Sequence, residues 1–249
     1  MIALASTVHD EHGGLRWLLR LHGDEIVRRF GRVVLVATPQ TDARLLGDAE
    51  RLGFSVTRLR KNVVGETYFQ AAKRGSDTGA ETVFLCDFDR VLHWLHAHPR
   101  EFDRALAAAR RQDYAIFERS PRAYRSHHDA LYWTEQAPNF LLSTALGNAT
   151  FHDHLSGCMA FSRRAARVIA SHGRTRSYDL FSRWPLLLRA TKISPTYIRC
   201  EGLEWETPDR FRAAVKRAGG VRQWRKRASS PAEWRKRARM AEEFVKWLR

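Results

Sequence analysis

The segment that most constrains the fold is Val83-Phe84-Leu85-Cys86, which is followed directly by Asp87 and, two residues later, by Asp89. Four consecutive apolar residues predict a strand that is buried on both faces, as in a parallel sheet. Because an extended backbone repeats every two residues, the pattern predicts that both carboxylates point the same way from the carboxyl end of this strand. Two carboxylates on one side favour a site for Mg²⁺ or Mn²⁺. The alternative is a pair of carboxylates that cap a loop.

Similar apolar runs recur along the chain and predict further strands at residues 2–5, 33–37, 54–59, 114–117, 157–161 and 196–200. Between them, helical spacing of apolar residues predicts helices over residues 15–30, 42–52 and 65–75. This alternation predicts an α/β fold, a mostly parallel sheet with helices on both faces. Ligands bind such sheets outside the carboxyl ends of the strands. The polar clusters at residues 6–11, 38–42, 60–62 and 87–89 are all predicted to lie there.

Prolines mark the predicted helix boundaries in the second half of the chain. Pro99 suits the first turn of a helix over residues 99–109. Pro138 is predicted to break the helical pattern of residues 121–150, and Pro185 to interrupt the helix that starts near Asp179.

The positive charge of the chain is concentrated at one end. The net charge is +16, but residues 210–249 hold fourteen Lys and Arg against three Glu, which leaves only +5 for the other 209 residues. We therefore expect a domain over residues 1–209 and a basic helical tail over residues 210–249. The tail contains a capping box, Ser230-Pro231-Ala232-Glu233, ahead of an apolar stripe. Three interpretations of the tail remain open: packing on the domain, binding of anionic lipid headgroups, and binding of nucleic acid, for which no recognised module appears.

Three cysteines, Cys86, Cys158 and Cys200, each lie in an apolar run, which predicts reduced thiols in the core and not disulfides or zinc ligands. The amino-terminal residues carry no basic leader, and no apolar run approaches the length that spans a membrane. The expected location is the cytoplasm, with peripheral contact to a membrane through the basic tail as an open alternative.

Four blocks of sequence occur in a suggestive order: residues 5–11, residues 62–75, residues 84–89, and residues 177–180 with 202–207. In this order they resemble the GT-A nucleotide-sugar glycosyltransferases, particularly the family 2-like group and its mannosylglycerate-synthase-like relatives. The resemblance covers roughly residues 2–210. It implies a Rossmann-like GT-A sheet and a metal-dependent transfer, with Mn²⁺ or Mg²⁺, from a GDP- or UDP-sugar to a hydroxyl acceptor. Tyr178 stands where inverting members usually have Glu, and the block typical of processive members is absent, which implies non-processive transfer.

On the donor side, the resemblance implies roles for seven residues of three blocks: Thr7, His9, Asp10, Glu11, Asn62, Gly65 and Asp87. Lys61 is added as a candidate on account of its charge. Asp10 and Glu11 would accept hydrogen bonds from the base or ribose. Their alternative role is to place negative charge at the helix start near Gly13-Gly14. Lys61 would neutralise phosphate, or else carry a solvated charge.

On the metal and acceptor side, the resemblance adds Asp89, Asp179, Trp205 and Glu206 to this set. Asp87 and Asp89 would hold the metal ion. The period-two spacing of His152 and His154 makes His154 a further candidate ligand, with an ordinary loop or core histidine as the alternative. Asp179 is the candidate general base, or else the N-cap of the helix that follows it. Trp205 and Glu206 would line the acceptor pocket, with core packing as the alternative for Trp205.

Two other functions compete with glycosyl transfer. A nucleotidyltransferase uses the same kind of sheet and metal, but would normally have a glycine-rich, basic loop after the first strand. The second competitor is a non-catalytic protein that binds nucleic acid or another anionic surface through the tail. Removing residues 210–249 is expected to separate them, since an enzyme would keep donor binding. The donor base and sugar, the acceptor, and the oligomeric state do not follow from the sequence.

Overall fold

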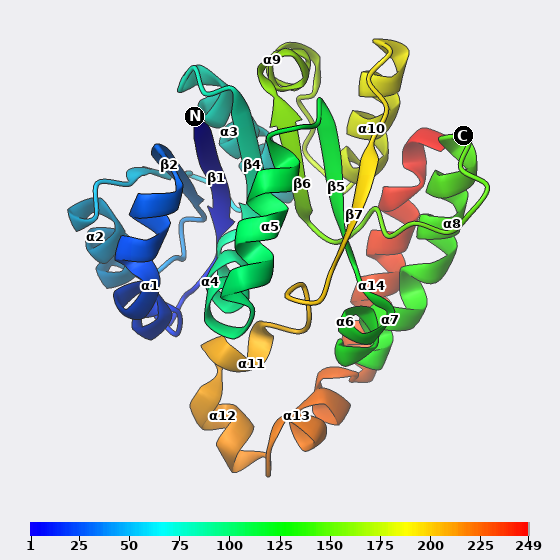
Figure 1. Cartoon of the computed structure of the whole chain (residues 1–249). Coiled ribbons are helices and arrows are strands. Elements are labelled where there is room, and N and C mark those ends of the chain that lie inside the picture. The colour runs from blue at the N-terminus through cyan, green and yellow to red at the C-terminus, as the bar shows by residue number, and fades with distance from the viewer. Residues whose placement is uncertain (249) are drawn as a thin grey trace.

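A computed structural model describes residues 1–248 and contains one seven-stranded sheet (Figure 1). Its strands are β1 (Ile2–Val8), β2 (Arg32–Ala37), β3 (Ser55–Arg58), β4 (Thr82–Asp87), β5 (Tyr114–Arg119), β6 (Cys158–Ser162) and β7 (Thr196–Cys200). The strand order is β3-β2-β1-β4-β6-β5-β7. β6 runs antiparallel to both of its neighbours, and all other pairs are parallel. The predicted α/β class with a mostly parallel sheet is confirmed.

Helices cover both faces of this sheet. They are α1 (Arg16–Arg29), α2 (Ala43–Arg51), α3 (Val64–Asp77), α4 (Phe88–Ala97), α5 (Pro99–Ala109), α6 (Pro121–Ser126), α7 (Asp129–Thr134), α8 (Gln136–Ala145), α9 (Arg163–His172), α10 (Leu180–Ala190), α11 (Thr207–Arg210), α12 (Arg212–Arg217), α13 (Val221–Ala228), α14 (Pro231–Phe244) and the 3₁₀ helix η1 (Lys246–Leu248). One core lies between the sheet and α1, α2, α4 and α5, and a second lies between the sheet and α3, α9 and α10. β4 serves both cores: Phe84 and Cys86 enter the first, and Val83 and Leu85 enter the second. This is why its sequence is apolar throughout.

Three local expectations were wrong. α4 begins at Phe88, so Asp89 lies in the first turn of a helix and not on extended backbone. Pro138 lies within the first turn of α8, where a missing backbone N–H costs no helical hydrogen bond. Pro185 lies inside α10 without ending it, because the neighbouring Trp184 and Leu188 are fully buried and hold the helix on the core.

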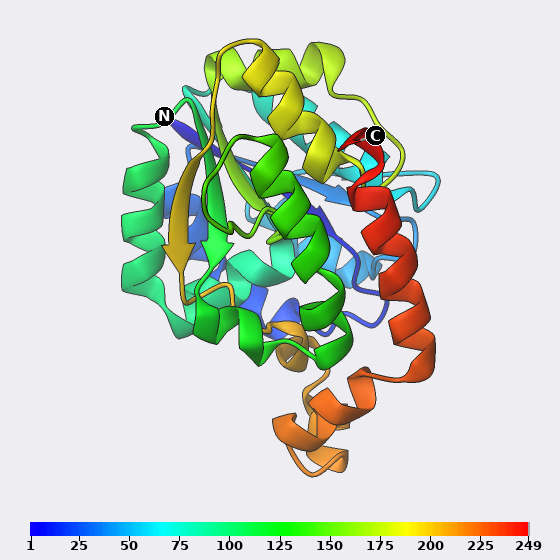
Figure 2. The same cartoon turned by 90° about the vertical axis from the view of Figure 1, so that its right-hand side faces the viewer.

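The basic tail forms the helices α12, α13 and α14 and the 3₁₀ helix η1. α12 and α13 project at one end, and α14 returns beside α7 and α8 (Figures 1 and 2). Arg237 of α14 lies 3.7 Å from the buried Glu135, and Phe244 joins the second core. Within residues 1–248, no helix is both long enough and apolar enough to cross a bilayer.

Candidate active site

A cavity of about 650 Å³ opens at the carboxyl ends of β1 and β4. One wall comes from the ends of these strands and the start of α3. The opposite wall comes from α7, α13 and α14, so the basic tail supplies part of the cavity lining. Parallel strands place their carboxyl ends at one edge of a sheet, which is where ligands of such folds bind.

Asp87 ends β4 and faces this cavity with 24% of its side chain exposed. The hydroxyl groups of Thr7 and Tyr68 each donate a hydrogen bond of 2.6 Å to its Oδ1 atom. Its Oδ2 atom lies 3.5 Å from Nε of Arg90. Burial raises the pKa of Asp87 above the usual aspartate range, although the charge of Arg90 acts in the opposite direction. The neutral hydroxyl groups of Thr7 and Tyr68 therefore fix the orientation of the Asp87 carboxylate through Oδ1, and its Oδ2 atom faces the guanidinium group of Arg90.

Asp89 lines the same cavity from the first turn of α4. Burial raises its pKa, and the nearby Glu206 carboxylate adds to the increase. Its Oδ2 atom lies 3.8 Å from Nη1 of Arg210, which belongs to the tail. Asp87, Asp89 and Glu206 thus place three acidic groups in the lining of one cavity. In the described chain, however, no group of three or more His, Cys, Asp or Glu side chains is arranged so that it could hold a metal ion.

Several hydrogen-bond donors at the cavity have no hydrogen-bond partner among residues 1–248. They are Nε and Nη1 of Arg90, Nε of Arg210 and Nε1 of Trp224. Nε of Arg90 makes no hydrogen bond but is ion-paired with Oδ2 of Asp87 at 3.5 Å. The guanidinium groups of Arg90 and Arg210 give the cavity positive charge, which suits a ligand with acceptor oxygens. Acidic and cationic groups occur side by side, which suits an anion that binds together with a metal ion.

The structure brings only some of the predicted donor-side residues to the cavity. Thr7, His9 and Asn62 line it, and Nδ1 of His9 lies 2.8 Å from Oγ1 of Thr38. Asp10 does not line it: its carboxylate accepts hydrogen bonds from the backbone N–H groups of Gly14 and Leu15, just before α1.

The other three donor-side residues also lie outside the cavity lining. Glu11 is exposed, with Oε1 3.7 Å from Nε2 of His9. Lys61 lines a separate surface pocket with Arg60 and Arg174. Gly65 lies where the backbone of residues 176–177 approaches α3, and a Cβ atom there would come within 2.5 Å of the Ser177 nitrogen. Gly65 therefore permits a close packing contact.

Two residues predicted for the metal and acceptor side, His154 and Asp179, do not line the cavity. His154 is buried, with Nε2 3.1 Å from Oγ of Ser143 and its ring edge against Tyr197, and it does not line the cavity. Asp179 is also buried and outside the lining; Thr175 donates a hydrogen bond to it, and Nε1 of Trp247 donates another of 2.7 Å. Burial raises the pKa of Asp179, but these hydrogen bonds outweigh it and lower the pKa, which makes the group a poor base.

Trp205 and Glu206 both line the cavity, and their acceptor-side role stays a prediction. Oε2 of Glu206 has no hydrogen-bond partner among the described residues. The sequence reasoning missed the contributions of Tyr68, Arg90 and the tail residues Arg210, Lys236 and Arg237. Arg90 directly follows Asp89, so its position in the motif was an available signal. No local pattern indicates that α14 returns to the cavity.

Comparisons with known proteins give distant structural likenesses. No family model and no curated protein matches the chain. Among solved structures, it is similar to glucosyl-3-phosphoglycerate synthase from Mycobacterium tuberculosis in complex with Mn²⁺, uridine-diphosphate-glucose and glycerol 3-phosphate, at 12% identity over 80% of this chain and 69% of that chain, with a TM-score of 0.48. It is also similar to CMP:2-keto-3-deoxy-manno-octonic acid synthetase complexed with CTP, at 13% identity over 87% of this chain and 98% of that chain, with a TM-score of 0.47. Likenesses of this degree assign neither a family nor an activity.

Proposed function

We propose that the chain is a metal-dependent glycosyltransferase that moves a sugar from a nucleoside-diphosphate donor to a hydroxyl acceptor. The observation that carries the proposal is that Asp87 and Asp89 line one cavity together with the guanidinium groups of Arg90 and Arg210. A bound diphosphate needs a bridging cation and hydrogen-bond donors. The two carboxylates of this cavity are the ligands for the cation, and the two arginines are the donors.

Asp87 and Asp89 are the residues that would hold Mg²⁺ or Mn²⁺. Two carboxylates fit such an ion because Mg²⁺ and Mn²⁺ usually keep several sites for water and phosphate oxygens. A bound divalent cation would offset the charge that develops on the leaving nucleoside diphosphate. Thr7 and Tyr68 fix the orientation of Asp87 through their hydrogen bonds. Arg90 and Arg210 would contact the diphosphate directly.

We assign the role of the acceptor-side base to Glu206 in place of Asp179. Glu206 lines the cavity and has a free oxygen among residues 1–248, whereas both oxygens of Asp179 are engaged elsewhere. In this role Glu206 would accept the proton of the acceptor hydroxyl as the sugar is transferred. Glu206→Gln should then lower kcat by about a hundredfold and change KM for the donor little.

The proposal is tested by calorimetric titration of UDP, GDP and CDP into the protein with and without Mn²⁺. One of these nucleotides is expected to bind, and Asp87→Asn should weaken its metal-dependent binding by about a hundredfold. Asp103→Asn is the matched control, because Asp103 is an exposed aspartate on α5 outside the cavity lining. Absence of nucleotide binding at millimolar ligand would refute the proposal.

A nucleotidyltransferase is the second candidate, because the same acidic pair and cations would also serve a nucleoside triphosphate. Product analysis separates the two activities. A glycosyltransferase releases a nucleoside diphosphate from a nucleotide sugar, whereas a nucleotidyltransferase releases pyrophosphate from a nucleoside triphosphate and a sugar substrate. Removal of residues 210–249 cannot separate an enzyme from a binding protein, because α13 and α14 line the cavity and their loss would disturb any ligand bound there.

A further inference from the structure

The helical segment that contains α7 and α8 carries apolar residues on its exposed face as well as on its buried face, where Leu131 and Leu142 pack inward. Its buried face carries the polar residues Glu135, Asn139 and Ser143, which hydrogen-bond to buried partners. Its exposed face carries Trp133, Ala137, Phe140, Leu141 and Thr144, which we call the outer stripe. These positions fall at helical spacing, and Trp133, Phe140 and Leu141 are 61%, 61% and 46% exposed. An ordinary surface helix directs its apolar residues inward, so this face fits a partner.

Charge is also missing from this surface. The sixteen residues 136–151 contain no Asp, Glu, Lys, Arg or His. Of the ten large apolar side chains exposed among residues 1–248, six belong to α7, α8, α14 and the segments that adjoin them: Trp133, Phe140, Leu141, Phe151, Trp234 and Trp247. α8 and α14 lie side by side on the near face in Figure 2. The exposed apolar area is therefore concentrated on one side of the molecule.

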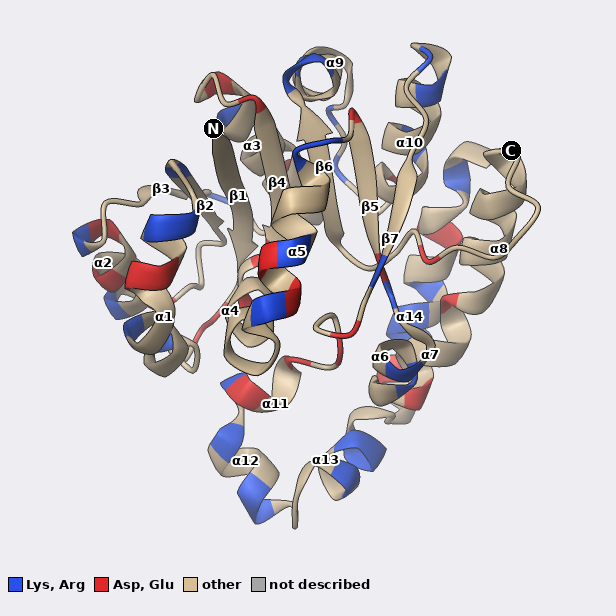
Figure 3. Cartoon of the chain, viewed as in Figure 1, with Lys and Arg blue, Asp and Glu red and all other residues tan. Residues whose placement is uncertain are grey.

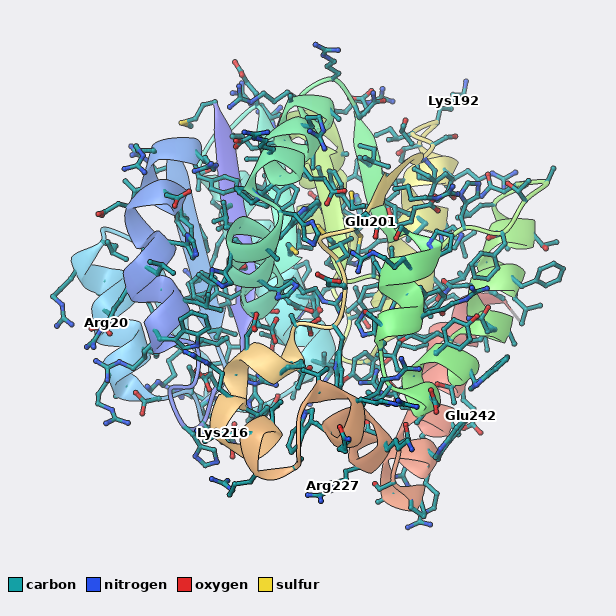
Figure 4. The ribbon with its side chains drawn as sticks, turned by 60° about the horizontal axis from the view of Figure 1, so that its bottom comes forward. Arg20, Lys192, Glu201, Lys216, Arg227 and Glu242 are labelled. Atoms are coloured by element: carbon teal, nitrogen blue, oxygen red, sulfur yellow. The ribbon has the colours of Figure 1, made fainter. Side chains whose placement is uncertain are left out.

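A strongly basic segment adjoins this side. Residues 210–230, which we call the basic lobe, contain eight Lys and Arg and no Asp or Glu. Figure 3 shows the lobe as the basic helices α12 and α13, and Figure 4 shows Lys216 and Arg227 at its outer edge. α13 contacts α7, which brings the lobe next to the outer stripe.

We propose that the outer stripe and the basic lobe dock on a bilayer surface that contains anionic phospholipid. Tryptophan, phenylalanine and leucine side chains without nearby charges suit the boundary between headgroups and acyl chains. The lobe supplies the positive charge that such a surface attracts. A second copy of this chain fits less well, because each copy carries a net charge of +16 and two copies repel each other. Since α7, α13 and α14 also line the cavity, docking brings its mouth close to the lipid surface.

The test is sedimentation of the intact protein with vesicles, one set of phosphatidylcholine alone and one of about equal parts phosphatidylcholine and phosphatidylglycerol. We expect binding to the anionic vesicles that weakens as salt is added, and little binding to the neutral ones. The double variant Phe140→Ser/Leu141→Ser should lower the affinity for anionic vesicles by about a hundredfold. Leu21→Ser is the matched control, since Leu21 is an equally exposed leucine on α1, and it should bind as the parent does.

A second variant tests the lobe and does not alter the stripe. Arg222→Gln/Lys226→Gln/Arg227→Gln replaces three exposed cations and should weaken binding by about a hundredfold and reduce its salt dependence. Circular dichroism checks that each variant is folded. Failure of the parent to bind anionic vesicles at low salt would overturn the proposal. So would a dimer in light scattering that Phe140→Ser/Leu141→Ser dissociates, because the stripe would then be an interface between copies. Vesicle binding needs no nucleotide, so its outcome is independent of the proposed activity.

Discussion

Arg119 at the end of β5 is the residue whose replacement tests the electrostatics of the fold most directly. Its side chain is fully buried, with Nε 2.6 Å from Oδ2 of Asp153 and Nη2 2.6 Å from Oε2 of Glu135. The same guanidinium lies over the ring of Tyr124, 4.0 Å from the ring centre. Arg237 of α14 in turn approaches Glu135, so this network connects the tail to the sheet.

Arg119→Met keeps most of the side-chain volume but leaves two buried carboxylates without their cation. Breaking one side of a buried ion pair costs about 3–5 kcal/mol, which is about a fifth or more of the stability of a typical domain of about 5–15 kcal/mol. With an m value of about 3 kcal/mol/M, the urea midpoint should fall by roughly 1–1.5 M. The matched control is Arg122→Met: Arg122 pairs with Glu201 and Glu204 but is 56% exposed, so its loss should cost about 1 kcal/mol or less.

The loss in Arg119→Met should also depend on pH. In the parent, burial would raise the pKa of Asp153, but the charge of Arg119 together with the hydrogen bonds that Asp153 accepts outweighs burial and lowers the pKa. That contribution to stability is present above the unfolded pKa of about 3.9 and disappears as the pH falls through the folded pKa. In the variant Asp153 keeps its hydrogen bonds from the backbone and Asn139, and Glu135 keeps Arg237, but burial is no longer opposed by the buried guanidinium. Both carboxyl groups therefore have higher pKa values than in the parent and regain stability by taking up protons as the pH falls.

The difference in unfolding free energy between parent and variant should therefore shrink between about pH 7 and pH 5. Urea unfolding followed by tryptophan fluorescence at both pH values measures it. An equal difference at the two pH values would show that Arg119 contributes by packing alone, and would refute the electrostatic reasoning.

Three further perturbations have definite expected outcomes. Burial would lower the pKa of His93, but the hydrogen bond to Asp209 and the neighbouring Glu204 outweigh burial and raise the pKa to about 9. The stability that His93 contributes should be full below about pH 6.5 and fall by roughly 3 kcal/mol as the pH rises through 9. His93→Gln should remove this pH dependence in urea unfolding. Gly202→Ala should lower the unfolding free energy by about 2 kcal/mol or more, because the added Cβ atom would collide with the fully buried Trp94; a melting temperature equal to that of the parent would contradict it. A thiol reagent should label none of the cysteines of the native protein within minutes and all three in urea, because Cys86, Cys158 and Cys200 are all buried and reduced.

The sequence predicted the strands more accurately than the candidate site. All seven strands were expected. For the central strands the signal was an apolar run, because a strand buried on both faces needs apolar residues on both, and that requirement is local. The clusters at residues 6–11 and 87–89 were predicted to lie at the carboxyl edge, and β1 pairs with β4 so that Thr7 lies beside Asp87. His154 and Asp179 failed because each had a plausible motif position but found its hydrogen-bond partners elsewhere. A side chain's direction depends on such contacts, which sequence spacing does not specify.

By itself, the sequence determined the alternating order of strands and helices, the acidic pair at the end of β4 and the basic composition of the tail. These properties depend on residues close together in the chain, through backbone periodicity and burial. Only the tertiary structure decided that the tail returns to line the cavity, that Arg210 approaches Asp89, and that Phe140 and Leu141 of α8 are exposed. Each of these depends on contacts between residues far apart in the sequence. Arg237 illustrates the reason. It lies against Glu135 only because α14 packs on α7, and no pattern within the tail specifies α7 as the packing partner.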